Sequence, residues 1–316
     1  MREFVVNEND AGQRVDKFLS KTVKRLPMPL LYKYLRLKRI KLNGKKCEQS
    51  VKLKTGDVLT LYINDEFFDE NKDTEFLCAP SALDIVYEDE NILLIDKKCG
   101  LVVHEDDEQT VDTAINRIKH YLYDKGEYLP ERENSFAPAL CNRIDRNTGG
   151  IVIAAKNAEA LRILNEKIRD REITKKYLCI TVGVPPKKSD TLTAYHEKNS
   201  ETNTVKISGT PTRSTKTIIT KYKVLKTKGE LALVEVELMT GRTHQIRAHM
   251  AYIGCPLLGD GKYGINRVNR AYNITAQALY AYSLGFDFTS ESGILNYLSG
   301  RMFTVNNVPF VERYFG

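Results

Sequence analysis

The sequence lacks any apolar stretch long enough to span a bilayer. Its first ten residues, MREFVVNEND, become polar too soon to form the apolar centre of a signal peptide. Because neither a membrane anchor nor a secretory signal is predicted, we expect a cytoplasmic protein that makes no membrane contact.

Metal-binding and nucleotide-binding motifs are missing as well. The six cysteines are scattered and form no CxxC pair, which argues against a zinc ribbon or a thioredoxin-type redox site. The sequence also contains no HExxH motif and no GxxxxGK[ST] loop. We therefore predict no metal and no other cofactor, and we expect the cysteines to be small buried residues in a reducing compartment.

What the chain does contain is an uneven distribution of charge. The net charge is +7, but residues 1–63 alone hold 15 lysines and arginines against 6 acidic residues. Residues 64–80 hold one lysine against 6 acidic residues. A compact basic segment suits a polyanion such as RNA, because each neutralised phosphate releases counterions. Charge alone leaves open a merely solvated, highly charged surface.

The basic segment has the pattern of two helices followed by short strands. Residues 10–26 carry apolar side chains at helical spacing after Asp10, a candidate N-cap, and residues 29–40 predict a second helix. The Asn-Gly pair at 43–44 predicts a hairpin, and residues 51–63 predict another pair of strands.

This pattern resembles a known RNA-binding module. RVDKFLS, LYKYLRLKRI, IKLNGKK and KTGDVLTL together are similar to the alpha-L module first known from ribosomal protein S-four. The resemblance implies a small α/β RNA-binding domain over residues 1–63. The side chains expected to contact RNA in it are Lys33, Arg36 and Arg39.

The remainder of the chain reads as a linker and a larger domain. Residues 64–80 are acidic and end in Pro80, which predicts a linker, although Phe67 and Phe68 leave open that it packs against the next domain. From residue 81 to residue 316, strands outnumber helices and do not alternate with them strictly. This favours an α+β fold with a mixed sheet over a parallel doubly wound one.

A carboxylate flanked by two arginines precedes a buried strand in this domain. The run NRIDRNTGG, residues 142–150, leads directly into the apolar IVIAAK. In an extended chain, Arg143 and Asp145 point to one face and Ile144 to the other. Such a carboxylate suits work as a nucleophile or a base. The alternative is a turn that is held by aspartate–arginine contacts.

Two histidines and two arginines lie close together in TGRTHQIRAHM, residues 240–250. A metal site is not predicted, because His244 and His249 are five residues apart and would diverge on a helix. Arg242 and Arg247 suit pairing with phosphate or carboxylate groups. For each histidine alone, a structural hydrogen bond at a helix start is the favoured interpretation.

These motifs together resemble those of RluA-type RNA pseudouridine synthases. NRIDRNTGGIVIAAKN is similar to their catalytic motif and TGRTHQIRAHM to their third motif. LIDKKCGLVVHE, ITKKYLCITVG and PLLGDGKYG match further motifs in family order. The resemblance implies a catalytic domain of this type over residues 81–316, with a mixed, mainly antiparallel sheet. With the basic module, it implies large-subunit ribosomal RNA as the first-choice substrate and transfer RNA as the second.

The resemblance also implies roles for individual residues. Asp145, Tyr177 and Arg247 would be catalytic: Asp145 as the essential carboxylate, Tyr177 beneath the uracil ring, and Arg247 paired with Asp145. Arg143 would enter the RNA stack when the target uridine is flipped out. Further residues expected to bind the substrate are Arg146, Thr148, Arg242, His244 and Gln245.

Two positions depart from the family pattern. Asn142 stands where a histidine is usual, and Lys98 follows Lys97 where a Lys-Pro pair is common. Neither position affects the aspartate, tyrosine or arginine roles, so these departures bear on the target more than on the reaction.

The expected reaction exchanges an N-glycosidic bond for a C–C bond to the same base, so it is redox-neutral. A single carboxylate serves it either as a nucleophile at the sugar or as a base that removes a sugar proton, and the sequence leaves both routes open. A hydrolytic glycosidase would want a second carboxylate. The main alternative is a non-catalytic RNA-binding ribosome-assembly factor. We expect a monomer, because no heptad pattern asks for a partner.

Overall fold

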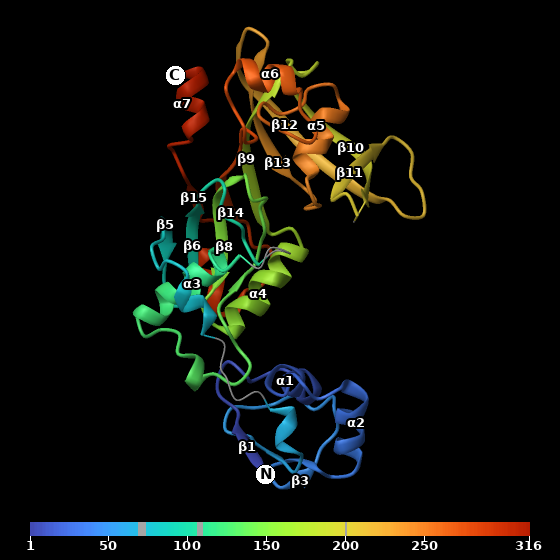
Figure 1. Cartoon of the computed structure of the whole chain (residues 1–316), viewed down its shortest axis with the longest axis vertical. Coiled ribbons are helices and arrows are strands. Elements are labelled where there is room, and N and C mark those ends of the chain that lie inside the picture. The colour runs from blue at the N-terminus through green and yellow to red at the C-terminus, as the bar shows by residue number, and fades with distance from the viewer. Residues whose placement is uncertain (69–73, 106–109, 200) are drawn as a thin grey trace.

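The computed structural model describes residues 1–68, 74–105, 110–199 and 201–316 (Figure 1). It contains a four-stranded sheet near the N-terminus and an eleven-stranded sheet in the rest of the chain. We call residues 1–68, which share one apolar core, the N-terminal module, and residues 74–316 the large domain. The module lies at one end of the long axis of the molecule (Figure 1).

The helices and strands of the described residues are, in chain order, β1 (Arg2–Val5), α1 (Val15–Thr22), α2 (Met28–Arg36), β2 (Ile40–Leu42), β3 (Lys45–Lys46), β4 (Val58–Leu61), η1 (Asp65–Phe67), η2 (Glu75–Cys78), β5 (Ile85–Glu88), β6 (Ile92–Lys97), α3 (Ala114–Asp124), η3 (Pro130–Arg132), β7 (Ala139–Leu140), β8 (Gly149–Ala155), α4 (Ala158–Arg169), β9 (Ile173–Val182), β10 (Ser189–Asn199), β11 (Thr204–Ser208), β12 (Lys216–Lys228), β13 (Leu231–Leu238), α5 (Gln245–Tyr252), α6 (Asn266–Ala271), β14 (Leu279–Phe286), η4 (Gly293–Leu298), β15 (Met302–Thr304) and α7 (Pro309–Phe315). None of the helices among these described residues is long and apolar enough to cross a membrane.

In the N-terminal module, α1 and α2 accompany an antiparallel sheet of order β1-β4-β2-β3. The expected hairpin at Asn43-Gly44 is confirmed, and both residues have positive φ, as a type I′ turn requires. The second helix ends at Arg36, earlier than predicted, because Lys38 adopts the left-handed conformation and redirects the chain into β2.

Two further expectations for the module were wrong. Of the two strands expected over residues 51–63, the second forms as β4, whereas residues 51–57 contribute one bridge, between Arg14 and Lys52. The edge partner of β4 is β1. Helix α1 begins at Val15 with Arg14 as its N-cap, so Asp10 does not cap it. The Asp10 side chain is fully buried and accepts hydrogen bonds from the large domain.

The two ends of the expected linker pack against different cores. Phe67 and Phe68 pack on the N-terminal module, where Phe68 stacks on Phe4 at a centroid distance of 6.4 Å. Phe76 packs on the large domain, edge to face with Tyr123. The sequence had left open that Phe67 and Phe68 pack against the large domain. They pack on the N-terminal module instead. Residues 69–73 of the expected linker lie outside the described residues.

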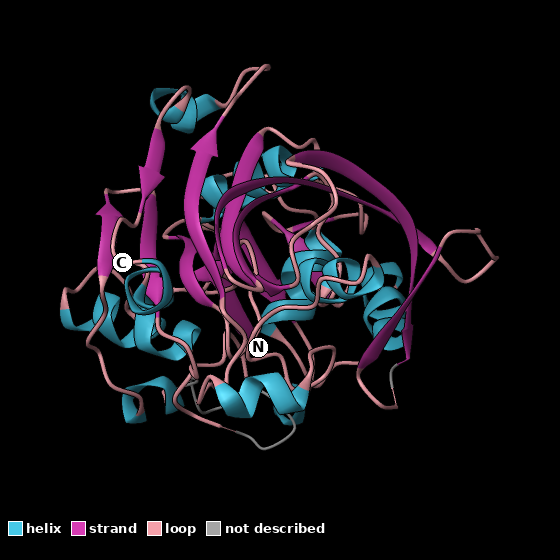
Figure 2. Cartoon of the chain, turned by 90° about the horizontal axis from the view of Figure 1, so that it is seen from above, coloured by secondary structure: helices cyan, strands magenta, loops and turns pink. Residues whose placement is uncertain are grey.

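The large domain has one mixed sheet of order β11-β10-β12-β13-β9-β14-β8-β6-β5, with β7 and β15 pairing at its side. Among the described residues, β8 and β14 pair in parallel, and the other strand pairs are antiparallel. Helices lie on both sides of this curved sheet (Figure 2). The predicted α+β fold with a mixed, mainly antiparallel sheet is confirmed.

The strands β6 and β8 are buried on both faces, which explains their almost uniformly apolar sequences. Leu93 and Val152 face one side, where they share a core with α3, α5 and Tyr177. Leu94 and Ile153 face the other, where they pack with α4 and the C-terminal part of β14. The candidate catalytic residues thus lie on the α3–α5 side of the sheet.

Candidate active site

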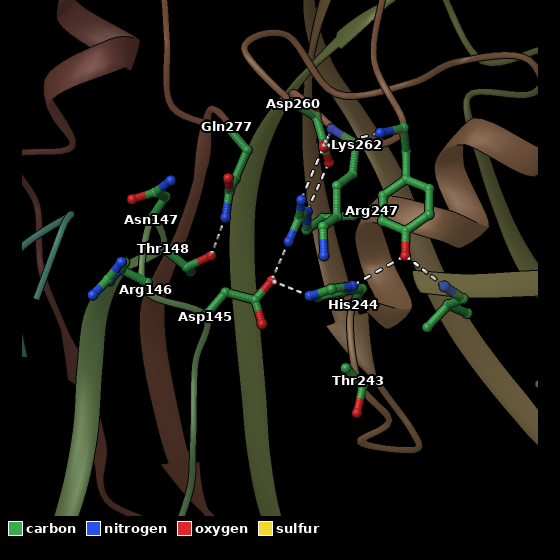
Figure 3. Close-up of polar contacts among 12 residues, drawn as sticks. Asp145, Arg146, Asn147, Thr148, Thr243, His244, Arg247, Asp260, Lys262 and Gln277 are labelled. Atoms are coloured by element: carbon green, nitrogen blue, oxygen red, sulfur yellow. Dashed lines mark hydrogen bonds and ion pairs between the residues drawn. The ribbon is translucent and has the colours of Figure 1, made fainter. Parts of the chain in front are cut away.

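Asp145 lies in the loop between β7 and β8 (Figure 3). The Thr148 backbone N–H donates to the Asp145 carbonyl oxygen at 3.0 Å and closes a tight turn. On the other side, the Asn142 side-chain oxygen accepts a hydrogen bond from the Ile153 N–H at 2.8 Å. Asn142, the position that departs from the family pattern, therefore fastens the loop to β8.

Two glycines after this turn let the loop enter the sheet at close range. Gly150 pairs in parallel with Ala281 of β14 and has a φ of +115°. A Cβ on Gly150 would lie 2.3 Å from the Ala281 carbonyl oxygen, which is closer than real Cβ contacts. The Gly-rich turn noted in the sequence is thus required by the approach of two backbones.

Lys97 holds the same loop in place, a role that was not predicted from the sequence. Its side chain is buried, and its ammonium group donates to the carbonyl oxygens of Lys98 at 3.0 Å, Leu101 at 2.6 Å and Arg146 at 3.1 Å. Burial lowers the pKa of Lys97 to about 8, while the charges of Cys99 and Asp145 oppose the shift. The available signal was a lysine two residues after the apolar run ILLI, within a motif that matched the family.

Arg247, on α5, joins Asp145 to a second carboxylate (Figure 3). Its Nη1 donates to Asp145 Oδ2 at 2.8 Å, whereas its Nε and Nη2 donate to the two oxygens of Asp260 at 2.7 and 2.9 Å. Asp260 is fully buried and also accepts from the N–H groups of Lys262 and Tyr263. The guanidinium is therefore fixed by Asp260 and presents its remaining side to Asp145.

The charges of this cluster support each other. Burial alone would lower the pKa of Arg247, but hydrogen bonds and charges from Asp260 and Asp145 raise it above its usual value. Burial alone would raise the pKa of Asp260, yet Arg247 holds it below its usual range. PLLGDGKYG was matched to the family motifs, but no role was predicted for Asp260 within it.

His244 approaches Asp145 from the other side. Its Nε2 lies 4.0 Å from Asp145 Oδ2, and its Nδ1 lies 3.0 Å from the Tyr263 hydroxyl. Because the Val205 N–H donates to that hydroxyl oxygen at 2.8 Å, the phenol proton is free to donate to Nδ1. The imidazole proton then sits on Nε2, facing Asp145. Burial lowers the pKa of His244, which favours this neutral ring.

Tyr177 lies on β9, directly opposite Val236 of β13 and on the α5 side of the sheet. It is 5% exposed. Burial, with the nearby charge of Asp145, raises its pKa above the usual range. The structure thus brings Asp145, Tyr177 and Arg247 together from a loop, a strand and a helix.

The arginines expected to bind RNA near this cluster are exposed. Arg143 is exposed and Ile144 is buried, so these two neighbours differ as the alternation predicted. Arg146 is exposed but points away from Asp145 (Figure 3). Arg242 is exposed just before α5. All three side chains are exposed, which is compatible with a phosphate contact.

Two of the residues expected to bind the substrate are buried and form hydrogen bonds within the protein. Thr148 is 1% exposed, and its hydroxyl oxygen accepts a hydrogen bond from Gln277 at 3.2 Å. Gln245 is 2% exposed. Its amide donates to the Ile219 carbonyl and the Thr220 hydroxyl, and its oxygen accepts from Thr240 and the Arg242 N–H, so its capacity is used within the protein.

The other three basic residues that were expected to bind RNA lie on the N-terminal module, away from Asp145. Lys33 and Arg36 are exposed in the last turn of α2, and Arg39 is exposed over the Tyr34 ring, with 5.3 Å from guanidinium to ring centroid. Within the described ranges, no three His, Cys, Asp or Glu side chains converge as metal ligands would.

Comparison with known proteins agrees with this arrangement. Residues 91–252, which include the Asp145 loop and α5, match the family model described as RNA pseudouridylate synthase. An uncharacterized RNA pseudouridine synthase of Bacillus subtilis is 31% identical, with 90% of this chain and 89% of the relative covered. The ribosomal large subunit pseudouridine synthase C of Buchnera aphidicola is 32% identical, with 89% and 88% covered.

The fold is also found in a solved structure. The human RNA pseudouridylate synthase domain containing 4 protein superposes with a TM-score of 0.57 at 22% identity, covering 72% of this chain and 92% of that one. The family model, the two bacterial relatives and the fold agree with the resemblance found in the motifs. The chain belongs to the RNA pseudouridylate synthase family and is an RNA pseudouridine synthase.

Proposed function

We propose that the protein converts selected uridines of large-subunit ribosomal RNA to pseudouridine, with Asp145 as its catalytic carboxylate. The observation that carries this proposal is the Arg247 guanidinium, which is fixed by buried Asp260 and paired with the more exposed Asp145. Since an ion pair with a rigid partner holds a carboxylate in one place, Asp145 is preorganised for one position on the substrate.

The chemistry asks for one such carboxylate. The N1–C1′ bond of uridine breaks, a C5–C1′ bond forms, and the hydrogen of C5 leaves as a proton while N1 gains one. Asp145 serves either by attacking C1′ or by removing the C2′ proton, and both routes begin from the carboxylate form. Arg247 stabilises the carboxylate form of Asp145 from which each route begins.

Access to the uridine requires that the base leave the RNA stack. A base within a stacked helix cannot reach a carboxylate in a protein loop, so enzymes of this kind extrude the nucleotide into a pocket. Tyr177 offers a flat ring beside Asp145 for the extruded uracil, and exposed Arg143 is suited to fill the space that it leaves.

The choice of ribosomal RNA rests on two observations. One relative of similar length is named for the large ribosomal subunit. The N-terminal module, whose likeness to the alpha-L fold stays a prediction, exposes Lys33, Arg36 and Arg39. Phosphate contacts of this kind give an affinity that falls steeply with salt. A cytoplasmic location and a monomeric state stay predictions.

The experiment is to map pseudouridine on ribosomal and transfer RNA from cells that lack the protein, by carbodiimide treatment and primer extension. The proposal predicts new stops in large-subunit RNA after incubation with the wild-type protein and none with Asp145→Asn. Stops confined to transfer RNA would contradict the target. Tight RNA binding without stops in either RNA would make the chain a binding factor.

A further inference from the structure

A second polar network lies away from the Asp145 site, between the N-terminal module and the large domain. On the module it comes from residues 7–13, between β1 and α1, which we call the docking turn. On the large domain it involves residues 132–135 and the first two turns of α4. The segment that joins these two parts covalently includes residues 69–73, so this network is a separate connection.

Asp10 is at the centre of the network. Its side chain is 0% exposed. Its Oδ2 accepts from Asn134 Nδ2 at 2.7 Å and its Oδ1 from Ser135 Oγ at 2.6 Å, both in the large domain, and Oδ2 also accepts from the Asn7 N–H at 3.2 Å. A buried carboxylate is costly unless hydrogen bonds replace its water. Two of these three hydrogen bonds to Asp10 can form only when the module and the large domain are in contact.

Neighbouring side chains extend the network to α4. Asn9 donates to Glu133 Oε1 at 2.8 Å and accepts from the Ala158 N–H, the first of α4, at 3.0 Å. Arg162 of α4 donates to the Ala11 carbonyl at 3.2 Å. Asn9 thus satisfies a helix N-terminal donor in another domain, which requires a defined orientation and not only proximity.

Gln13 completes the contact by donating to the Ser135 hydroxyl at 2.7 Å. The other amide atom of Gln13, Oε1, is buried without a hydrogen-bond partner among the described residues. With Asp10 fully buried among large-domain donors, these contacts make a buried polar interface between the module and the large domain.

The network is connected to both ends of the Asp145 loop. Residues 132–135 lead through β7 into the loop, and α4 follows β8, which begins where the loop ends. β8 is buried along its whole length and spans roughly 20 Å at ~3.3 Å per residue. The docking turn and Asp145 are thus placed at opposite ends of one rigid strand.

We propose that the docking turn fixes the N-terminal module in one orientation on the large domain, and that Asp10 is its central positioning residue. Its consequence for catalysis rests on the proposed function. RNA held by Lys33, Arg36 and Arg39 then meets the Asp145 site at a set spacing. A second contact raises affinity most when its spacing matches, so the module increases the effective concentration of RNA at the site.

The first test removes the two donors from the large-domain side, which leaves the module sequence untouched. The variant is Asn134→Ala/Ser135→Ala, and the matched control is Asn306→Ala/Asn307→Ala, two exposed side chains of the same domain. Small-angle scattering of the full chain should show one compact arrangement for the wild type and the control. It should show a larger radius of gyration for the variant. Adding Asp10→Ala to this variant should not increase the radius further, because Asp10, Asn134 and Ser135 act through one interface.

The second test uses the mapped RNA in two lengths. For a long RNA, the variant should raise KM about tenfold or more at an unchanged kcat, because the module no longer adds to binding at the site. For a short RNA that carries the uridine but does not reach the module, variant, control and wild type should have the same KM. A loss of kcat on the short RNA would instead indicate damage to the Asp145 loop.

Two results would overturn the proposal: scattering of the variant that equals that of the wild type, or an equal KM on the long RNA. The proposal would also be overturned if the scattering curve of the wild type could be fitted only by an ensemble in which the module takes many positions relative to the large domain. If the wild type forms no pseudouridine on any RNA, the proposed function fails, and the scattering comparison still decides whether the module is docked.

Discussion

The guanidinium of Arg247 bridges Asp145 and Asp260, two carboxylates that differ sharply in burial. The Asp145 side chain is 28% exposed, whereas that of Asp260 is 0% exposed. The buried carboxylate receives two of the hydrogen bonds and fixes the arginine, and the exposed carboxylate receives the third. One side chain therefore serves both the stability of the large domain and the position of the candidate catalytic group.

This bridge predicts that Arg247→Met is costly to the fold. The variant leaves Asp260 buried without its ion-pair partner, so we expect the free energy of unfolding to fall by about 3–5 kcal/mol. Arg242→Met, at an exposed arginine five residues earlier, should change it by less than about 0.5 kcal/mol. Urea unfolding followed by circular dichroism measures both. Equal midpoints for the two variants would show that the bridge does not stabilise the fold.

The parallel contact of β8 with β14 predicts that Gly150 tolerates no side chain. Gly150→Ala places a Cβ against the Ala281 carbonyl in a left-handed backbone region, and we expect a loss of about 3 kcal/mol or more. Gly241→Ala is the control, because a Cβ there meets no atom within 4 Å. Thermal unfolding of the two variants compares them. A Gly150→Ala protein as stable as the control would mean that the loop enters the sheet differently.

The buried histidine of α5 predicts an acid-sensitive fold. His249 is 1% exposed and hydrogen bonds to Thr220, and burial lowers its pKa to about 4. The unfolded chain, with a histidine pKa of about 6.5, binds the proton first as the pH falls. This contribution to stability is therefore complete above about pH 6.5 and is lost between there and about pH 4, a total of about 3 kcal/mol.

His249→Gln, which can still bond to Thr220, should not show that loss. Between pH 7 and pH 4, the free energy of unfolding of the wild type should drop by about 3 kcal/mol more than that of the variant. Chemical unfolding at several pH values gives the two curves. Parallel curves would indicate that folding leaves the pKa of His249 unchanged.

Much of the fold could be predicted from the local pattern of apolar residues. The strands that were not predicted depend on partners far away in the sequence or lack such a pattern. The apolar run IVIAAK predicted β8, because a strand that is buried on both faces has an apolar sequence in any fold. β10 and β11 were not predicted. Their side chains are largely exposed or only partly buried, so they show little apolar alternation. Likewise β1 becomes a strand because β4 offers it an edge, a partner that lies more than fifty residues away.

The candidate site shows the same division. The ion pair of Asp145 with Arg247 joins residues 102 positions apart and came from motif resemblance, not from local pattern. Motif position did not distinguish side chains that face the substrate from those that hold the motif together. The burial of Thr148 and Gln245 was therefore not predicted, since it depends on segments that the motifs do not contain. Asp260 and Lys97 were overlooked for the same reason.

The most direct test of Asp145 follows the hydrogen that must leave C5 of the target uridine. With RNA labelled by tritium at C5, the wild-type protein should release tritium to water in proportion to the pseudouridine formed. Asp145→Asn should slow release by about a thousandfold or more, about 4 kcal/mol of barrier, while still binding the RNA. Release by Asp145→Asn at a rate near that of the wild type would contradict the assignment of Asp145 as the catalytic carboxylate.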